Sequence, residues 1–304
     1  MLTDPFEQLD QALQSGLDIS DDQAEFFSAL DDTAWPRFVE LWEGLESEHR
    51  LTLLSRLGEA AEEILRLDFA RVYEHALDDT DPTVRELAVR LASEAPTIPL
   101  AERYLDLAAT DPDEEVRVAA LEELSAFTFE AQVEDWPSAE QSRLERFLST
   151  TLHDREADFN IRRAALLSES YLTTDGVVSD IRWAQTQPDL EAVAVEAMGR
   201  NCQDMWIPDI QAALRSDEAR LQVAAAGASA ELEDQRLIPD LLLQLRDPED
   251  EVRLAAVAAL GIIGGEDAKD ALTDLLQSRD RDVRTAAKDA LDELLANDEP
   301  LDGL

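Results

Sequence analysis

The sequence contains few cysteine, glycine and proline residues and no long apolar run, and each of these absences excludes a class of protein. Its 304 residues include a single cysteine, Cys202, so we expect neither an internal disulfide nor a cysteine-based metal site. With 10 glycines and 12 prolines it is not collagen-like. No run of about 18 or more apolar residues occurs, which predicts that nothing spans a membrane. The first residues lack a basic stretch followed by an apolar one, so we expect no secretory signal and a cytoplasmic protein.

Positive charge is scarce, and lysine is almost missing. Lys and Arg together number 26 against 69 Asp and Glu, the formal net charge is −43, and the two lysines are Lys269 and Lys288. Binding to nucleic acid depends on Lys and Arg that neutralise phosphates, so we expect no nucleic-acid partner and no anionic membrane surface. The acids could attract a basic segment of another protein or could serve only to hydrate the surface. Their even spread along the chain favours hydration.

What the sequence does contain is an internal repeat. The segment 247–261 reads Asp-Pro-Glu-Asp-Glu-Val-Arg followed by an alanine-rich stretch. Shifts of 31 residues place Val252 on Val283, on Leu221 and on Leu190, each within a similar segment. Looser copies lie at 160–166, 111–121 and 79–91. A fixed period of this length is the signature of a stacked repeat architecture.

Each repeat predicts two helices. The second helix starts near the Val-Arg pair and carries small or apolar residues at helical spacing, and the first helix lies before the Asp-Pro turn. No segment shows a sustained alternation of apolar and polar residues, so we expect no sheet. The predicted fold is all-α, a right-handed α-solenoid of about eight to nine helix pairs.

The repeat at 247–261 resembles HEAT repeats, in particular the phycobilisome-lyase-like HEAT subtype. The resemblance covers residues 78–296 and is weaker over 33–77. In such families the turn Asp and the Arg of the Val-Arg pair join along the stack as a structural ladder. The residues at those positions here are Asp79, Arg85, Asp111, Arg117, Asp247, Arg253 and Arg284.

We expect an N-terminal helical cap or arm over 1–32, one continuous solenoid over 33–296 and a flexible tail over 297–304. The step from Val116 to Ile161 exceeds the period by about 14 residues, which predicts an insertion near 125–138 that emerges as a loop. Ser138 followed by Gln141 reads as a capping box for the next helix. Aromatic residues are the candidate partner-binding anchors: Phe127, Phe129 and Trp136 in the insertion, with Trp183 and Trp206 as weaker candidates outside it. The alternative for the three in the insertion, which we favour, is that they pack on the adjacent helices.

No set of residues suggests catalysis, a cofactor or a metal. His49, His75 and His153 stand alone among charged residues, without the four His-Glu pairs of the HEAT-repeat hydroxylase of deoxyhypusine. Cys202 has no neighbouring base in the sequence and is expected to be a free, partly buried thiol. The acidic clusters lack the loop of a calcium-binding EF-hand, so we interpret them as solvated turns.

The sequence therefore predicts a non-catalytic scaffold or adaptor that binds another protein, one with a basic segment, on the concave face of the solenoid. A bilin-lyase-like enzyme or accessory subunit is the alternative, and binding of a bilin with a shift in its absorption would distinguish it. A HEAT-like DNA glycosylase is disfavoured by the net charge of −43. A further possibility is a structural protein whose acidity serves only its ionic surroundings.

Overall fold

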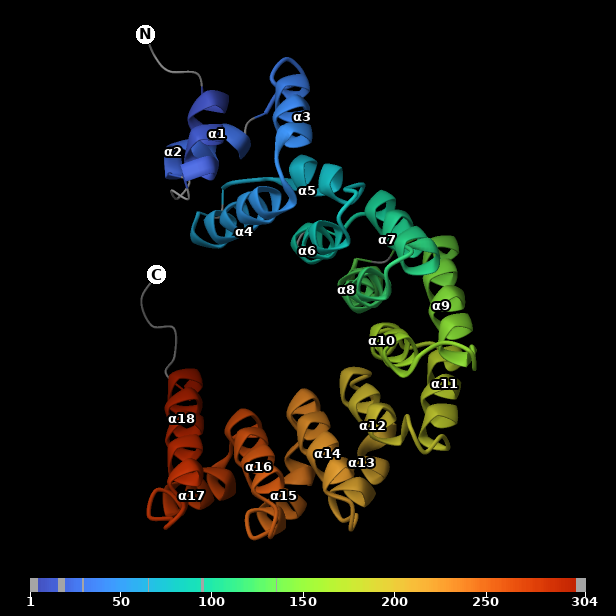
Figure 1. Ribbon diagram of the computed structural model, residues 1–304. Helices are drawn as coiled ribbons and strands as arrows, with labels where there is room; N and C mark the ends of the chain where they lie inside the picture. The colour runs from blue at the N-terminus through green and yellow to red at the C-terminus, as the bar shows by residue number, and fades with distance from the viewer. Residues whose placement is uncertain are drawn as a thin grey trace. The chain divides into compact units, whose positions relative to one another are not determined.

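The computed structural model describes residues 5–15, 20–28, 30–64, 66–93, 96–134 and 136–298. Within these ranges every regular element is a helix, which confirms the predicted all-α solenoid (Figure 1). By its internal contacts the chain divides into two compact units, residues 1–130 and 131–304. No helix in the described part of the chain is both long and apolar enough to cross a membrane.

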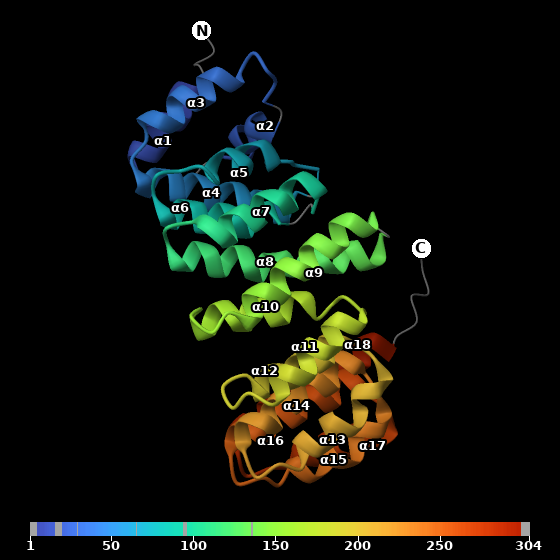
Figure 2. The same ribbon diagram turned by 90° about the vertical axis from the view of Figure 1, so that its right-hand side faces the viewer.

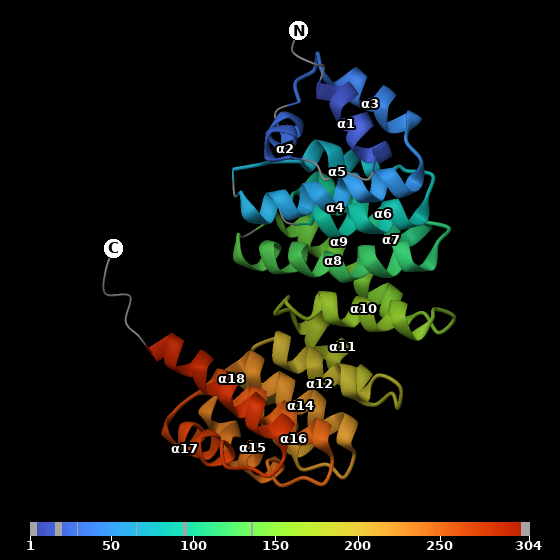
Figure 3. The ribbon, with the colours of Figure 1, turned by 60° about the vertical axis from the view of Figure 1, so that its left-hand side comes forward.

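The first unit stacks helices in pairs. Helices α4, α6 and α8 lie side by side, with α5 and α7 behind them (Figure 3). Helices α3 and α4 precede these pairs, in the segment 33–77 where the HEAT resemblance is weaker. The bounds are α1 (Pro5–Ser15), α2 (Asp21–Ser28), α3 (Trp35–Gly44), α4 (Ser47–Glu63), α5 (Ala70–Ala76), α6 (Pro82–Ala92), α7 (Ile98–Thr110) and α8 (Glu114–Val133), and the boundary between the units falls inside α8.

The N-terminal helices α1 and α2 pack on α3 through aromatic rings. Phe6 and Phe27 are buried, and their ring centroids lie 5.9 Å apart. The ring of Phe27 lies 6.1 Å from that of Phe38 on α3. Edge-to-face pairs of this kind add to the apolar area that each ring buries. The described parts of residues 1–32 therefore share the core of the first unit.

The second unit repeats the same pairing. Helices α10, α12, α14, α16 and α18 form one layer, and α9, α11, α13, α15 and α17 form the other (Figures 1 and 2). We call the first of these the second-helix layer, because it holds the second helix of each pair. The bounds are α9 (Ser138–His153), α10 (Phe159–Glu169), α11 (Asp175–Gln185), α12 (Glu191–Arg200), α13 (Ile207–Leu214), α14 (Ala219–Leu232), α15 (Ile238–Gln244), α16 (Asp250–Ile263), α17 (Glu266–Leu275) and α18 (Arg281–Asp298), with short 3-10 helices at Asp204–Trp206 and Gln235–Leu237.

Small residues let neighbouring second helices approach closely. Gly199 on α12 faces Ala228 on α14, and a Cβ added to the glycine would lie 2.5 Å from the Cα of Ala228. Gly261 on α16 faces Ala290 on α18 in the same way, with the added Cβ 2.7 Å from the Ala290 Cβ. The alanine-rich sequence of the repeats is thus explained by the close packing of one helix layer.

The structure corrects two expectations about local structure. The additional residues at 125–138 do not form a loop, because α8 continues to Val133 and α9 begins at Ser138. Ser138 is the first residue of α9 and not its N-cap, and the N-cap residue, Pro137, makes no side-chain capping hydrogen bond. Residues 297 and 298 belong to α18, whereas the rest of the predicted tail, 299–304, lies outside the described residues.

Candidate functional site

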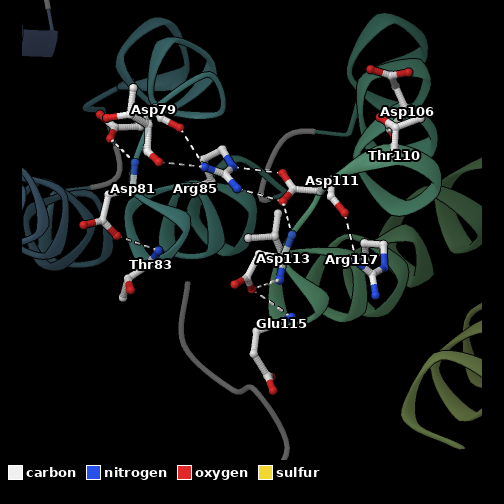
Figure 4. Close-up of polar contacts among 12 residues, drawn as sticks. Asp79, Asp81, Thr83, Arg85, Asp106, Thr110, Asp111, Asp113, Glu115 and Arg117 are labelled. Carbon is white, nitrogen blue, oxygen red and sulfur yellow. Dashed lines mark hydrogen bonds and ion pairs between the residues drawn. The ribbon is translucent and has the colours of Figure 1, made fainter. Parts of the chain in front are cut away.

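A ladder of polar contacts joins consecutive repeats in the first unit. Arg85, near the start of α6, donates from Nε to Asp111 Oδ2 at 2.9 Å and from Nη2 to Asp111 Oδ1 at 2.7 Å. Its Nη1 donates to the carbonyl oxygen of Asp79 at 2.8 Å, in the turn before its own helix (Figure 4). The side chains of Arg85 and Asp111 are only 11% and 4% exposed. One guanidinium therefore ties its own turn to the turn of the next repeat.

The electrostatics of Asp111 follow from this geometry. Burial acts to raise the pKa of its carboxyl, but the hydrogen bonds from Arg85 and from the Asp113 backbone, with the charges of Arg85 and Arg117, outweigh burial and leave the pKa below its usual value. Asp111 Oδ1 also accepts the Asp113 N–H at 2.9 Å, which fixes the turn. The Asp111 carboxylate is therefore kept ionised, and both of its oxygens accept hydrogen bonds from groups of the protein itself.

Other rungs follow the same plan with variations. In the first unit Arg50 Nη1 lies 2.9 Å from Asp79 Oδ2, which also accepts the Trp42 Nε1–H at 2.9 Å. In the second unit Arg253 donates to Asp247 O at 2.9 Å and to Asp280 Oδ2 at 3.1 Å. The remaining contacts of this type are Arg162 to Asp189 at 2.8 Å, Gln222 to Asp247 at 3.2 Å, Arg117 to the carbonyl of Asp111 at 2.9 Å and Arg284 to the carbonyl of Ser278 at 2.7 Å.

The candidate aromatic anchors do not share one surface. Phe127 is fully buried, with its ring centroid 5.0 Å from that of Tyr104. Trp206 is also fully buried and donates from Nε1 to Asn201 Oδ1 at 2.8 Å. These two residues are core residues, so we do not carry them into the proposed binding surface. The other three, Phe129, Trp136 and Trp183, are partly exposed, and the exposed fraction of residue Phe129 is 52%.

A groove lies on the second-helix layer of the second unit, and we call it the α14 groove. It has a volume of about 500 Å³, which is in the range of ligand-binding clefts. Its floor consists of small and apolar residues, and charged residues stand at its edges. The lining residues are Ala192, Glu196 and Arg200 of α12, Arg220, Val223, Ala224, Gly227, Ala228 and Glu231 of α14, and Glu251 of α16.

Gly227 is an unexplained glycine at the centre of the α14 groove. It lies in the interior of a 14-residue helix, where glycine costs roughly 1 kcal/mol relative to alanine. It is exposed, its φ is not positive, and a Cβ added to it would meet no atom within 4 Å. Neither packing nor backbone conformation therefore requires glycine here, in contrast to Gly199 and Gly261.

The charged residues at the edges of the groove differ in how many ion pairs and hydrogen bonds they make within the protein. Arg220 binds Glu191 at 3.2 Å, Glu218 at 2.8 Å and the carbonyl of Pro188 at 3.0 Å. Arg200 donates to the carbonyl of Leu167 at 3.5 Å. Glu196 lies 3.6 Å from Arg163. Glu231 and Glu251 have no ion-pair partner among the residues that the structure describes, and the same is true of Arg200, so the groove offers unpaired charge of both signs.

The groups with catalytic or metal-binding chemistry do not converge. Across the described ranges no three His, Cys, Asp or Glu side chains lie close enough together to hold a metal ion. His153 Nε2 lies 2.7 Å from Asp180 Oδ1, and His75 is surrounded by the rings of Trp35, Phe38 and Trp42. Burial lowers the pKa of His75, against the attraction of Asp79 and Glu43.

Cys202 and Glu169 have perturbed pKa values for different reasons. Cys202 is a free cysteine in a left-handed turn with φ of 51° after α12; the residue is exposed, and its thiol is partly desolvated. Partial desolvation and the nearby Glu231 and Glu233 raise the pKa of its thiol, which disfavours the reactive thiolate.

Glu169, the last residue of α10, is fully buried, and neither carboxyl oxygen has a hydrogen-bond partner in the described structure. Burial, followed by Asp180 and Glu145, raises its pKa well above the usual value.

Sequence reasoning missed the residues of the α14 groove. Its search for anchors started from large aromatic side chains, whereas the floor of the groove is made of small ones. The available signal was Gly227 itself, a glycine in the middle of the helical run 219–232. Asp280 was missed as a ladder residue because it stands two positions after the residue that the 31-residue shift aligns with Asp247.

Several solved structures align with this chain at low sequence identity. None of the curated proteins matches the sequence. Among solved structures, YibA from Escherichia coli aligns at 18% identity over 96% of this chain and 98% of its own, with a TM-score of 0.45. An engineered protein aligns at 17% identity over 94% and 88%, with a TM-score of 0.42. A designed armadillo repeat protein aligns at 18% identity over 65% and 100%, with a TM-score of 0.34.

Part of the second unit matches a known family model. Residues 207–292, which run from α13 into α18, match the family model described as HEAT repeats. The matched segment includes the repeat at 247–261 in which the Asp-Pro turn and the Val-Arg pair are most complete. The match does not distinguish a HEAT subtype. Residues 207–292 of this chain are therefore similar to HEAT repeats.

Proposed function

We propose that the protein is a non-catalytic scaffold or adaptor of the cytoplasm that binds another protein through its second-helix layer. The observation that carries this proposal is the α14 groove, which combines an apolar floor with charged edges on three successive repeats. HEAT-type repeats are typical of protein-interaction scaffolds, because stacked helices present an extended surface on rigid elements. The groove gives that general role a specific location.

The partner is proposed to carry a basic segment and not to be a nucleic acid. Glu231 and Glu251 stand at the groove without ion-pair partners in the described structure, and the chain as a whole has a net charge of −43. A field of this sign repels phosphates and raises the local concentration of cations, which increases the rate of encounter with a basic partner.

Affinity capture from a native lysate tests the proposal, with the groove itself as the variable. The three baits are the wild type, Gly227→Leu, which fills the centre of the groove, and Gly227→Ala, which adds one methyl group to open space. We expect one protein to be retained in stoichiometric amount by the wild type and largely by Gly227→Ala, and to be lost from Gly227→Leu. Retention should weaken between about 0.1 M and 0.5 M salt, because exposed charges are screened.

The matched pair of variants keeps this experiment interpretable. Both substitutions lie at the same exposed position of α14, so a difference between them reports occupancy of the groove and not loss of the fold. Melting temperatures measured on all three baits provide the check. A partner that Gly227→Leu retains as well as the wild type, or the absence of any stoichiometric partner, contradicts the proposal.

A further inference from the structure

We infer that the contact between the helix pair α9–α10 and the next pair, α11–α12, is a pH-sensitive joint of the second unit. The joint is closed while His153 and Glu169 carry protons, and it loosens as pH rises. In a stack of repeats each pair contacts only its neighbours, so one weakened contact can open while the other repeats stay folded. The joint acts within the protein and does not depend on the occupant of the α14 groove.

Ion pairs join successive first helices of the second unit, in the layer that contains α11, α13 and α15 (Figure 1). At the α11–α13 contact, Arg182 Nη1 lies 2.7 Å from Asp209 Oδ1. At the α13–α15 contact, Arg215, the residue after α13, places its Nε 2.7 Å from Asp240 Oδ1. Both bases are arginines, whose guanidinium stays charged at every physiological pH. These two contacts therefore keep their positive charge as pH rises.

The α9–α11 contact has a histidine in this role. His153 is the last residue of α9, and its Nε2 lies 2.7 Å from Asp180 Oδ1 on α11. The side chain of His153 is 39% exposed, so it can exchange protons with the solvent. Histidine is the side chain whose charge changes between about pH 5 and pH 8. At this one of the three contacts, the positive charge of the ion pair is therefore lost as pH rises.

A buried carboxyl lies at the same contact. Glu169, at the end of α10, is 0% exposed, and neither of its carboxyl oxygens has a hydrogen-bond partner among the described residues. Burial, followed by the charges of Asp180 on α11 and Glu145 on α9, raises the pKa of Glu169 well above its usual value. Glu145 also links the two pairs, because its Oε1 accepts the Thr174 hydroxyl at 2.8 Å. Three acids from three helices thus meet at the joint.

The charged residues that reach α10 from α12 contact other groups. Arg200 donates to the carbonyl oxygen of Leu167 at 3.5 Å, and Glu196 lies 3.6 Å from Arg163. The charges that act on Glu169 are those of the two acids on α9 and α11. An ionised Glu169 would therefore face two carboxylates without a compensating positive charge among the groups that act on it.

Glu169 and His153 respond to pH in the same direction. An exposed Glu titrates near pH ~4.3, so opening of the joint releases the proton that the closed joint holds on Glu169. Each unit of pH then raises the equilibrium constant for opening about tenfold, as long as the closed carboxyl stays protonated. Loss of the charge on His153 weakens its pair with Asp180 over the same rise in pH. A higher pH therefore favours the open joint through both groups.

Hydrogen–deuterium exchange of the full chain, followed by mass spectrometry, tests the joint. Exchange is measured at about pH 6, 7 and 8, with labelling times scaled to the intrinsic exchange rate at each pH. Peptides from 159–185 report on α10 and α11, and peptides from 219–263 report on repeats outside the joint. In the wild type we expect the opening constant of 159–185 to rise about tenfold per unit of pH. Peptides from 219–263 should show a much smaller rise.

Two variants assign the effect to the two groups. Glu169→Gln removes the titrating carboxyl and should abolish most of the rise in 159–185. His153→Arg supplies the base that the other two contacts use, so it should lower the opening constant about threefold at pH 8 and less at pH 6. The controls make the same changes outside the joint, through Glu156→Gln at an exposed position and His49→Arg on α4. Both controls should follow the wild type.

The opposite results overturn the joint. A rise in 159–185 that persists in Glu169→Gln would mean that another group releases the proton. An equal rise in 219–263 of the wild type would mean that the general negative charge loosens the whole unit. Exchange in 159–185 that does not change with pH would contradict a protonated Glu169, and identical exchange in His153→Arg and the wild type would contradict the role of His153.

Discussion

At the scale of single residues, the glycines of the second-helix layer differ in whether helix packing requires them. Gly199 and Gly261 sit where a methyl group would collide with the next helix, whereas Gly227 faces open space. The three positions share the same helical environment, so their alanine variants should respond in opposite directions. The difference depends only on what lies opposite each Cα.

We predict that Gly227→Ala raises the free energy of unfolding by about 0.5–1 kcal/mol, because alanine is the better helix former and nothing opposes its Cβ. Gly199→Ala and Gly261→Ala should lower it by about 1–3 kcal/mol, because the new Cβ would lie 2.5 Å from Ala228 Cα and 2.7 Å from Ala290 Cβ. Urea denaturation of the three variants measures these changes. Destabilisation by Gly227→Ala would show that the fold itself needs this glycine.

Buried Glu169 makes a second prediction, concerning pH. Because burial, and then Asp180 and Glu145, raise its pKa in the folded protein, folding favours the protonated carboxyl. An unfolded Glu titrates near pH ~4.3, so the contribution of Glu169 to stability falls as pH rises from there through its folded pKa. Glu169→Gln should therefore raise the melting temperature relative to the wild type, and more at pH 8 than at pH 5.

The comparison of variants isolates Glu169 from the other acids, which titrate alike in both proteins. Glu156→Gln, an exposed change of the same kind, provides the control and should shift the melting temperature little at either pH. A Glu169→Gln effect that is constant between pH 5 and pH 8 would mean that the carboxyl does not stay protonated in the folded protein.

Individual residues also show where sequence reasoning ends. The alanine and Val-Arg pattern predicts which face of each second helix is buried, because that periodicity is written in the sequence. Phe127 and Phe129 are two positions apart on α8, and one is fully buried while the other is half exposed. Two positions on a helix lie about 200° apart around its axis, so this difference follows from helical periodicity. The sequence reasoning missed it because it expected a loop at these residues.

At the scale of helices and turns, the Arg85–Asp111 contact is the strongest rung of the ladder. The pair is nearly buried and bidentate, so removal of the arginine leaves a carboxylate without compensation. We predict that Arg85→Ala lowers the free energy of unfolding by about 2–4 kcal/mol. Arg253→Ala should have a smaller effect, because the side chain of Asp280 is 37% exposed to solvent. Urea denaturation measures both free-energy changes, as shifts of the midpoint with an unchanged slope of the unfolding free energy against urea concentration.

The same rung predicts a dependence on acid. Asp111 has a lowered pKa in the folded protein, so its contribution is present above the unfolded value near ~3.9 and is lost as pH falls through the folded pKa. Asp111→Asn should therefore be most destabilising at neutral pH and less so below about pH 3. For the preceding prediction, an equal decrease in the free energy of unfolding of the Arg85→Ala and Arg253→Ala proteins would contradict the ranking of the two contacts by burial.

Helix lengths were predictable only where the repeat is regular. The helix pairs from α11 to α18 follow a fixed 31-residue period, and the sequence places them closely. The additional residues near 125–138 break the period, and the expectation of a loop was wrong because they lengthen α8 and α9 instead. Good helix formers such as Glu130, Ala131 and Gln132 follow Phe129 with no Gly or Pro before Pro137, which was the available signal.

At the scale of the whole molecule, charge should dominate the response to salt. The chain carries 43 more negative than positive charges, and their mutual repulsion opposes the compact state. Screening reduces that repulsion, since the Debye length falls from about 10 Å at 0.1 M to about 3 Å at 1 M salt. We predict that the melting temperature rises steadily between low salt and about 1 M KCl. A flat melting temperature over this range would show that charge repulsion is not a significant cost.

The whole-molecule account also shows what the sequence could and could not provide. Fold class follows from the period, the Asp-Pro turns and the absence of alternating strands, all of which are local patterns. The α14 groove requires three helices from successive repeats, with Glu251 of α16 brought to the edge of a floor made by α12 and α14. Such a surface is a property of stacking, so one repeat read alone does not reveal it.

The most direct test of the central claim is to ask whether another protein occupies the α14 groove. A photo-crosslinking amino acid, p-benzoylphenylalanine, is placed at Val223 in the groove and, in a second protein, at Asp274, which is exposed on α17 in the other layer. After irradiation in native lysate, we predict a single protein adduct from position 223 and none from position 274. No adduct at position 223, or the same adducts at both positions, would contradict a binding surface in the groove.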